Sequence, residues 1–116
     1  MRVDILGTEY KIIVDSYDDP ELKGKNRMGY CFFDEREIHI EDFNTDDDWK
    51  DESDTAKKNR KNTILRHEII HAFLYESGLC QNSADVTAWA TNEEMVDWIA
   101  IQFTKILKAF QEVRCL

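Results

Sequence analysis

The sequence predicts an α+β domain in which a small sheet comes first and two helices follow. Residues 1–43 contain short β-rich runs separated by turn residues, which are typical of strands and hairpins. Residues 54–78 and 91–113 carry apolar residues at spacings of three and four, the period of a helix with one buried face. Because the strands precede the helices and do not alternate with them, an α+β fold is expected and a βαβ fold is not.

The chain has 116 residues, which is the size of one domain, so we expect residues 1–116 to form a single unit. Its formal net charge of −9 argues against binding to nucleic acid, which needs a basic patch, and against docking on an anionic membrane. No apolar run is long enough to cross a bilayer, and the N-terminus turns polar too early for a signal peptide. Cys31, Cys80 and Cys115 are scattered and odd in number, which favours a reducing compartment and predicts a cytoplasmic protein.

Four runs of the first segment are expected to be strands of an antiparallel or mixed sheet. Residues 2–6 and 10–15 flank Gly7 and should form a hairpin. Residues 28–33 should pair with residues 36–41 across a short turn.

The last of these runs alternates strictly between apolar and polar side chains. Ile38 and Ile40 therefore fall on one face of the strand and His39 on the other. We expect the isoleucines in the core and His39 near the surface.

Residues 44–54 form a polar stretch that contains the acidic run Asp46, Asp47 and Asp48. The run is typical of a solvated loop. It could also bind a cation, but it lacks the glycine and the closing glutamate of an EF-hand calcium loop, so a calcium site of that kind is not expected.

The helix expected over residues 54–78 should be capped by Asp54 or Thr55 and should end near Gly78. Its first turns are polar, and its apolar face consists of Leu65, Ile69, Ala72 and Phe73. The helix expected over residues 91–113 has a longer apolar stripe, formed by Met95, Val96, Ile99, Phe103, Ile106, Leu107 and Phe110.

His67, Glu68 and His71 form the pattern H-E-x-x-H within the first helix. Residues four apart lie one turn above each other, so both imidazoles can reach a single Zn²⁺ ion. Glu68 leaves the helix about 100° away from His67, which suits a general base better than a ligand. The short pattern also occurs by chance, and a pair of ordinary, partly buried histidines is the structural alternative.

A catalytic zinc site needs a third protein ligand, and the start of the second helix offers one. Glu93 and Asp97 lie four residues apart and share a face. Glu94 competes for the ligand role, but its partner four residues later is Trp98, whereas Glu93 has a carboxylate there. An exposed acidic pair, favoured by the helix dipole at a helix N-terminus, is the structural alternative.

The pattern H-E-x-x-H, followed some twenty residues later by N-E-x-x-x-D, resembles the gluzincin clan of zinc peptidases, to which thermolysin belongs. The likeness covers roughly residues 67–97 and is greatest to the single-domain minigluzincins. It implies a zincin-like fold and one zinc ion held by His67, His71 and Glu93. It also implies that Glu68 is the general base and that Asp97 hydrogen-bonds His67.

The chain departs from the larger gluzincins in the groups that bind substrate. Those enzymes use a tyrosine or histidine to stabilise the oxyanion, and Tyr75 and His39 are the candidates here. They also carry a C-terminal substrate-binding subdomain, for which only 23 residues remain after Glu93. An edge strand of their sheet pairs with extended substrate, and residues 36–41 are the expected counterpart.

The expected function is hydrolysis of a peptide or protein substrate by water that zinc activates and Glu68 deprotonates. The alternative is a non-catalytic, zinc-stabilised binding or regulatory module of the same fold. Small zincins of this kind are typical of phages and mobile elements and cut one regulatory protein, so the resemblance suggests such an origin. The patterns predict no oligomeric state.

Overall fold

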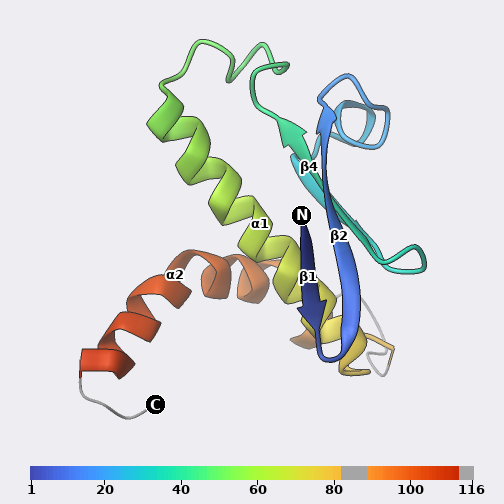
Figure 1. Ribbon diagram of the computed structural model, residues 1–116, viewed down its shortest axis with the longest axis vertical. Coiled ribbons are helices and arrows are strands. Elements are labelled where there is room, and N and C mark those ends of the chain that lie inside the picture. The colour runs from blue at the N-terminus through green and yellow to red at the C-terminus, as the bar shows by residue number, and fades with distance from the viewer. Residues whose placement is uncertain (82–88, 113–116) are drawn as a thin grey trace.

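The computed structural model describes residues 1–81 and 89–112, the side chains of 109–112 excepted. A four-stranded mixed sheet is followed by two long helices, so the α+β prediction is confirmed (Figure 1). The elements in chain order are β1 (Arg2–Ile5), β2 (Thr8–Ser16), the 3₁₀ turn η1 (Lys23–Lys25), β3 (Gly29–Phe32), β4 (Glu37–Asp42), α1 (Asp54–Glu76), the 3₁₀ turn η2 (Trp89–Thr91) and α2 (Glu93–Glu112).

The strands lie in the order β1-β2-β4-β3. The two expected hairpins are confirmed, because β1 pairs antiparallel with β2 and β3 pairs antiparallel with β4. The central pair β2 and β4 is parallel. The expectation that residues 36–41 form the edge strand is wrong, since β4 lies between two strands and β3 is the outer strand at that end of the sheet.

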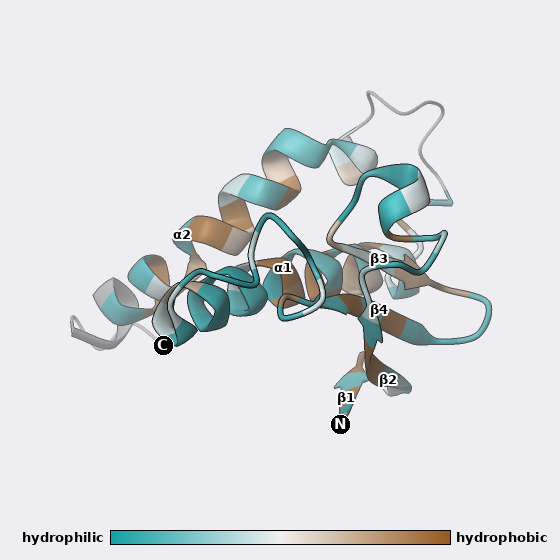
Figure 2. Ribbon diagram, turned by 90° about the horizontal axis from the view of Figure 1, so that it is seen from above, coloured by the Kyte–Doolittle hydropathy of each residue, from teal (hydrophilic) through white to brown (hydrophobic). Residues whose placement is uncertain are grey.

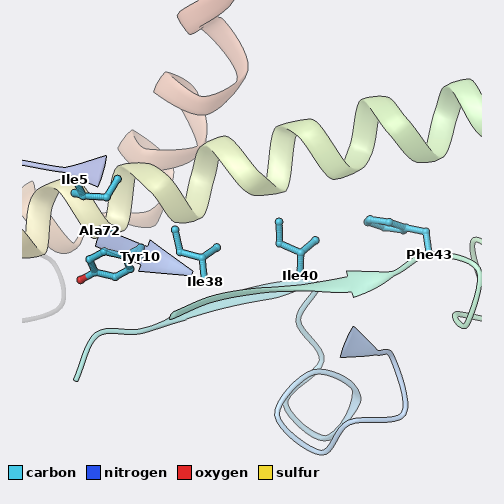
Figure 3. Packing of buried hydrophobic residues seen from close by; sticks show 6 residues of the cluster. All are labelled: Ile5, Tyr10, Ile38, Ile40, Phe43 and Ala72. Atoms are coloured by element: carbon cyan, nitrogen blue, oxygen red, sulfur yellow. The ribbon is translucent and has the colours of Figure 1, made fainter. Parts of the chain in front are cut away.

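The core lies between one face of the sheet and α1. Ile38 and Ile40 are fully buried and point from β4 toward the helix, as the alternation predicted (Figure 3). Ile5, Tyr10 and Phe43 complete the sheet side of this cluster, which meets α1 at its buried residue Ala72. Each large aliphatic side chain buried in this way contributes roughly 1.5–3 kcal/mol.

The first helix, α1, begins one residue from the expected cap. The hydroxyl of Ser53 accepts a hydrogen bond from the backbone N–H of Ala56 at 3.1 Å, so Ser53 is the N-cap in place of Asp54 or Thr55. At the other end the helix stops at Glu76, and Gly78 has a φ of +83°, a left-handed conformation that glycine adopts without strain.

Helix α2 begins where Asn92 caps it. The Asn92 side-chain oxygen accepts the backbone N–H of Met95 at 2.8 Å, which makes Glu93 the first helical residue. The helix packs on α1 through Val96 and Ala100, which are fully buried. The guanidinium of Arg66 on α1 also donates to the Ala100 carbonyl at 2.7 Å.

The second half of α2 runs away from the sheet and diverges from α1 (Figure 1). For this reason Phe103, which the apolar stripe predicted to be buried, is 48% exposed. The side chain of Phe110, residue 113, Cys115 and residues 82–88 of the expected linker lie outside the described residues. Neither described helix combines the length and the apolar character that a membrane-spanning helix needs.

The loop between β4 and α1 is polar, as are the first turns of α1 that follow it (Figure 2). Most of its residues are exposed, as expected of a solvated loop. Among the acidic residues of this loop Asp46 is the exception, because only 4% of it is exposed. Its side chain accepts the backbone N–H of Asp48 at 2.9 Å and so belongs to a turn, and not to the solvent-facing side of the loop.

Gly29, the first residue of β3, allows α1 to lie directly against this strand. A Cβ atom at position 29 would lie 2.8 Å from Cγ2 of Ile64 and 3.3 Å from Cγ of Glu68. Any side chain here would therefore collide with Ile64 and crowd Glu68, so these side chains or α1 itself would have to shift.

We expect Gly29→Ala to lower the free energy of unfolding by about 1–3 kcal/mol, the usual cost of overpacking. Gly24→Ala is the matched control, because its Cβ would meet only Pro20 at 3.8 Å. That change should stay within about 0.5 kcal/mol of the unsubstituted chain. Urea unfolding followed by circular dichroism measures both, and equal stabilities would contradict the close approach at Gly29.

Candidate metal centre

The two histidines of α1 lie side by side, as their spacing of four predicts. The Nε2 atoms of His67 and His71 are 2.9 Å apart. Both side chains are only 16% exposed. The Nε2 atom of each ring therefore points toward the same position beside the helix.

Helix α2 brings a carboxylate to this point. Oε2 of Glu93 lies 3.2 Å from Nε2 of His67 and 3.2 Å from Nε2 of His71. The position follows from the Asn92 cap, which makes Glu93 the first residue of a helix that crosses α1. Three potential ligand atoms from two helices thus converge.

Asp97, one turn further along α2, binds the far side of His67. Its Oδ1 atom lies 2.6 Å from Nδ1 of His67. Since a carboxylate can only accept here, Nδ1 carries the proton and donates it, which leaves the lone pair of Nε2 directed at the meeting point. The structure therefore brings together all four residues that the sequence singled out for zinc and its outer support.

The meeting point has the dimensions of a zinc site. Its three atoms are 2.9, 3.2 and 3.2 Å apart. A tetrahedral zinc ion with bonds of about 2.0–2.1 Å holds its ligand atoms roughly 3.3 Å apart. Because the proton of His67 is on Nδ1, the only hydrogen atom available to these three contacts is one on Nε2 of a neutral His71. The three contacts therefore cannot all be hydrogen bonds. Burial lowers the pKa of His71, which favours the neutral imidazole that a metal requires.

Glu68 lies beside the three ligand atoms and not among them. The potential ligand atoms of Glu68, His67 and His71 lie within 4.8 Å of one another. Among the described residues, however, no ion pair joins Glu68 to either imidazole, whereas Oε2 of Glu93 lies 3.2 Å from Nε2 of both, so Glu93 is the better ligand. The Glu68 side chain is buried, with 6% of the residue exposed, and packs next to Gly29. Burial raises its pKa to about 7.

The choice between Glu93 and Glu94 is decided by where each side chain lies. Glu94 borders a separate hollow of about 380 Å³, together with Trp89 and Trp98. Glu93 borders the cleft of the two histidines. The preference for Glu93 that the sequence suggested thus agrees with the geometry.

A cleft of about 640 Å³ opens over the histidines and Glu68. Tyr75 lines it, with its ring stacked on Phe33 at 4.2 Å. The suggestion that His39 serves this site is wrong, because His39 does not border the cleft. Its ring is held between Asp15 at 2.6 Å and Glu37 at 3.1 Å.

The sequence reasoning missed Arg27, the one lysine or arginine among the described residues that line the cleft. Its guanidinium donates to the carboxylate of Glu21 at 2.9 Å and lies 4.4 Å from the centre of the Tyr30 ring. Arg27 precedes β3 in an irregular segment, where no periodicity indicates the direction of a side chain. Only the position of β3 at the sheet edge, next to α1, reveals it.

Comparison with known proteins adds nothing to this geometry: no family model, no curated protein and no solved structure matches the chain. The likeness to gluzincins therefore rests on the residues and on their arrangement.

We expect the chain to bind one equivalent of Zn²⁺, and His71→Ala to abolish tight binding. Asp97→Asn should weaken binding by about 10–100-fold, the usual effect of losing a carboxylate that supports a ligating histidine. Competition with a chromophoric zinc chelator measures these affinities. Glu94→Gln is the matched control and should bind like the unsubstituted chain. If it bound as weakly as Glu93→Gln, the assignment of Glu93 would fail.

Proposed function

We propose that this protein is a zinc-dependent peptidase of the gluzincin type. The observation that carries the proposal is the convergence of two imidazoles and one carboxylate at 2.9–3.2 Å, with a buried second carboxylate beside them in an open cleft. Three protein ligands with one open position are typical of catalytic zinc, whereas structural zinc is usually closed by four.

The side chains have separate tasks in this proposal. His67, His71 and Glu93 would hold the ion, which would supply a Lewis acid able to polarise the scissile carbonyl. Asp97 keeps His67 in the tautomer whose Nε2 is free to bind. Its hydrogen bond also fixes the plane of the ring.

Glu68 acts as the general base. It accepts a proton from the attacking water and then delivers that proton to the nitrogen of the leaving amine, so it ends the cycle as it began. Its contact with Gly29 holds the carboxylate at the wall of the cleft. A carboxylate that is close to the ligands without being one of them is what this role needs.

An extended peptide fits the shape of the site. The outer strand β3 borders the cleft through Gly29, Tyr30 and Cys31, and a peptide backbone can pair with a strand of this kind. The strand that would bind substrate is therefore β3, the hairpin partner of the one that the sequence suggested. The aromatic pair Phe33 and Tyr75 would contact substrate side chains.

The second candidate is a zinc-stabilised module that binds a partner without turnover. It is favoured by the origin of the ligands in two helices, because a metal there would fasten α2 to α1. Tyr75, the remaining candidate for the oxyanion donor, has its ring stacked on Phe33, where it serves packing. This also favours the module. Glu68 separates the two functions, since a purely structural zinc site does not need it.

Glu68→Gln should retain zinc and reduce peptide hydrolysis by at least about 10²-fold, because general-base catalysis contributes a factor of 10²–10⁴. Zinc content and cleavage of a library of internally quenched peptides are measured on the same samples. Glu94→Gln is the control, with an acidic residue changed outside the cleft. Equal cleavage by Glu68→Gln would refute the assigned base. No zinc-dependent cleavage by the unsubstituted chain, with zinc bound, would favour the module.

A further inference from the structure

A second group of carboxylates lies away from the histidines, at the end of β4. Glu41 is fully buried, and neither of its side-chain oxygens accepts a hydrogen bond from a donor group among the described residues; the side chain that it meets is the carboxyl of Asp46. Burial of a polar group without a partner costs several kcal/mol, and an isolated carboxylate costs more. A carboxylate in this position is therefore stable only with a proton or a cation.

The acidic loop that follows β4 faces Glu41. Asp46 is itself 4% exposed, and the negative charges of Asp46 and Asp48 add to burial in raising the pKa of Glu41 to about 7. The acidic run that the sequence assigned to solvent thus has a buried carboxylate from the strand directed into it. An EF-hand pattern does not include such a carboxylate, because EF-hand ligands come from within one loop, whereas Glu41 belongs to the strand before it.

Lys57, Lys58 and Lys61 border the same hollow as Glu41, but among the described residues none of them forms an ion pair with it. Lys50 pairs with Asp47 at 2.6 Å, and Lys57 donates to Asn44 and to the Lys50 carbonyl. Among the described residues no ion pair includes Glu41 or Asp46. The charge of the two buried carboxylates is left without a protein counter-ion.

We propose that Glu41 and Asp46 bind a hard divalent cation, with Ca²⁺ the best fit. All the side chains involved offer oxygen and none offers nitrogen or sulfur, which favours Ca²⁺ or Mg²⁺ over zinc. Ca²⁺ tolerates irregular geometry and completes its six to eight ligands with main-chain oxygens and water, whereas Mg²⁺ demands a near-ideal octahedron. Asp48 adds negative charge beside the ion.

The cation would fasten the loop to the sheet just before α1. This loop ends at Ser53, the cap of the helix that carries His67 and His71. The site shares no residue with the zinc centre, so it can be present whether or not the protein is a peptidase.

The test is thermal unfolding of the full-length chain at pH 7.5 with and without CaCl₂, together with calorimetric titration. At a hundredfold excess of Ca²⁺ over Kd we expect the Tm to rise by roughly 10 °C. Glu41→Gln and Asp46→Asn should each abolish the rise. Asp47→Asn is the matched control, because Asp47 is exposed and paired with Lys50. It should keep the full rise, as should His71→Ala.

No rise at about 10 mM Ca²⁺ or Mg²⁺, roughly tenfold above the Kd of the weakest calcium sites, would overturn the proposal. So would a rise that Glu41→Gln leaves intact, since this indicates general screening of the acidic surface. A proton in place of the cation has its own signature. With a folded-state pKa of about 7 and an ordinary value of 4.5, Glu41 makes the chain less stable as the pH rises through that interval. Such a loss, absent from Glu41→Gln and insensitive to Ca²⁺, would identify the proton and exclude the ion.

Discussion

The packing of α1 across the sheet is the interaction on which the site depends. Ala72 and its apolar neighbours on α1 face Ile38 and Ile40, and this contact fixes the rotation of the helix about its axis. With that rotation set, successive residues leave the helix about 100° apart. Glu68 then lies against β3, and His67 and His71 lie where α2 crosses. The same contact therefore positions the proposed base and the proposed ligands, although they face different neighbours.

Local patterns allowed much of this fold to be predicted. The strict alternation in β4 identified the buried face, and the capping residues and Gly78 located the helix ends within a residue or two. Sheet order was not predictable, because hairpins show which strands are joined and not which strand inserts between two others. Phe103 shows the same limit, since periodicity indicates a face of α2 but not whether α1 extends far enough to cover it.

For the site, the sequence predicted the residues with strong local geometry. Spacings of four within helices brought His67 to His71 and placed Glu93 with Asp97, and the crossing of the helices did the rest. Arg27 was missed and the burial of Asp46 was not predicted, because both lie in irregular segments, where neither burial nor direction follows from a period. His39 was misjudged for a different reason. Its residue type suits an oxyanion donor, but its face of the sheet looks away from α1.

The contact between Glu68 and Gly29 separates two ways in which this protein can fail. If the proposed zinc site is occupied, changes on the α2 side would remove the ion and, with it, the link between the helices. Changes on the β3 side would move the base and leave the ion in place, giving a loaded but inert protein. Loss-of-function variants should therefore fall into two classes, which metal content distinguishes without any knowledge of the natural substrate. A screen of random variants sorted in this way would map the base side and the ligand side of the domain independently.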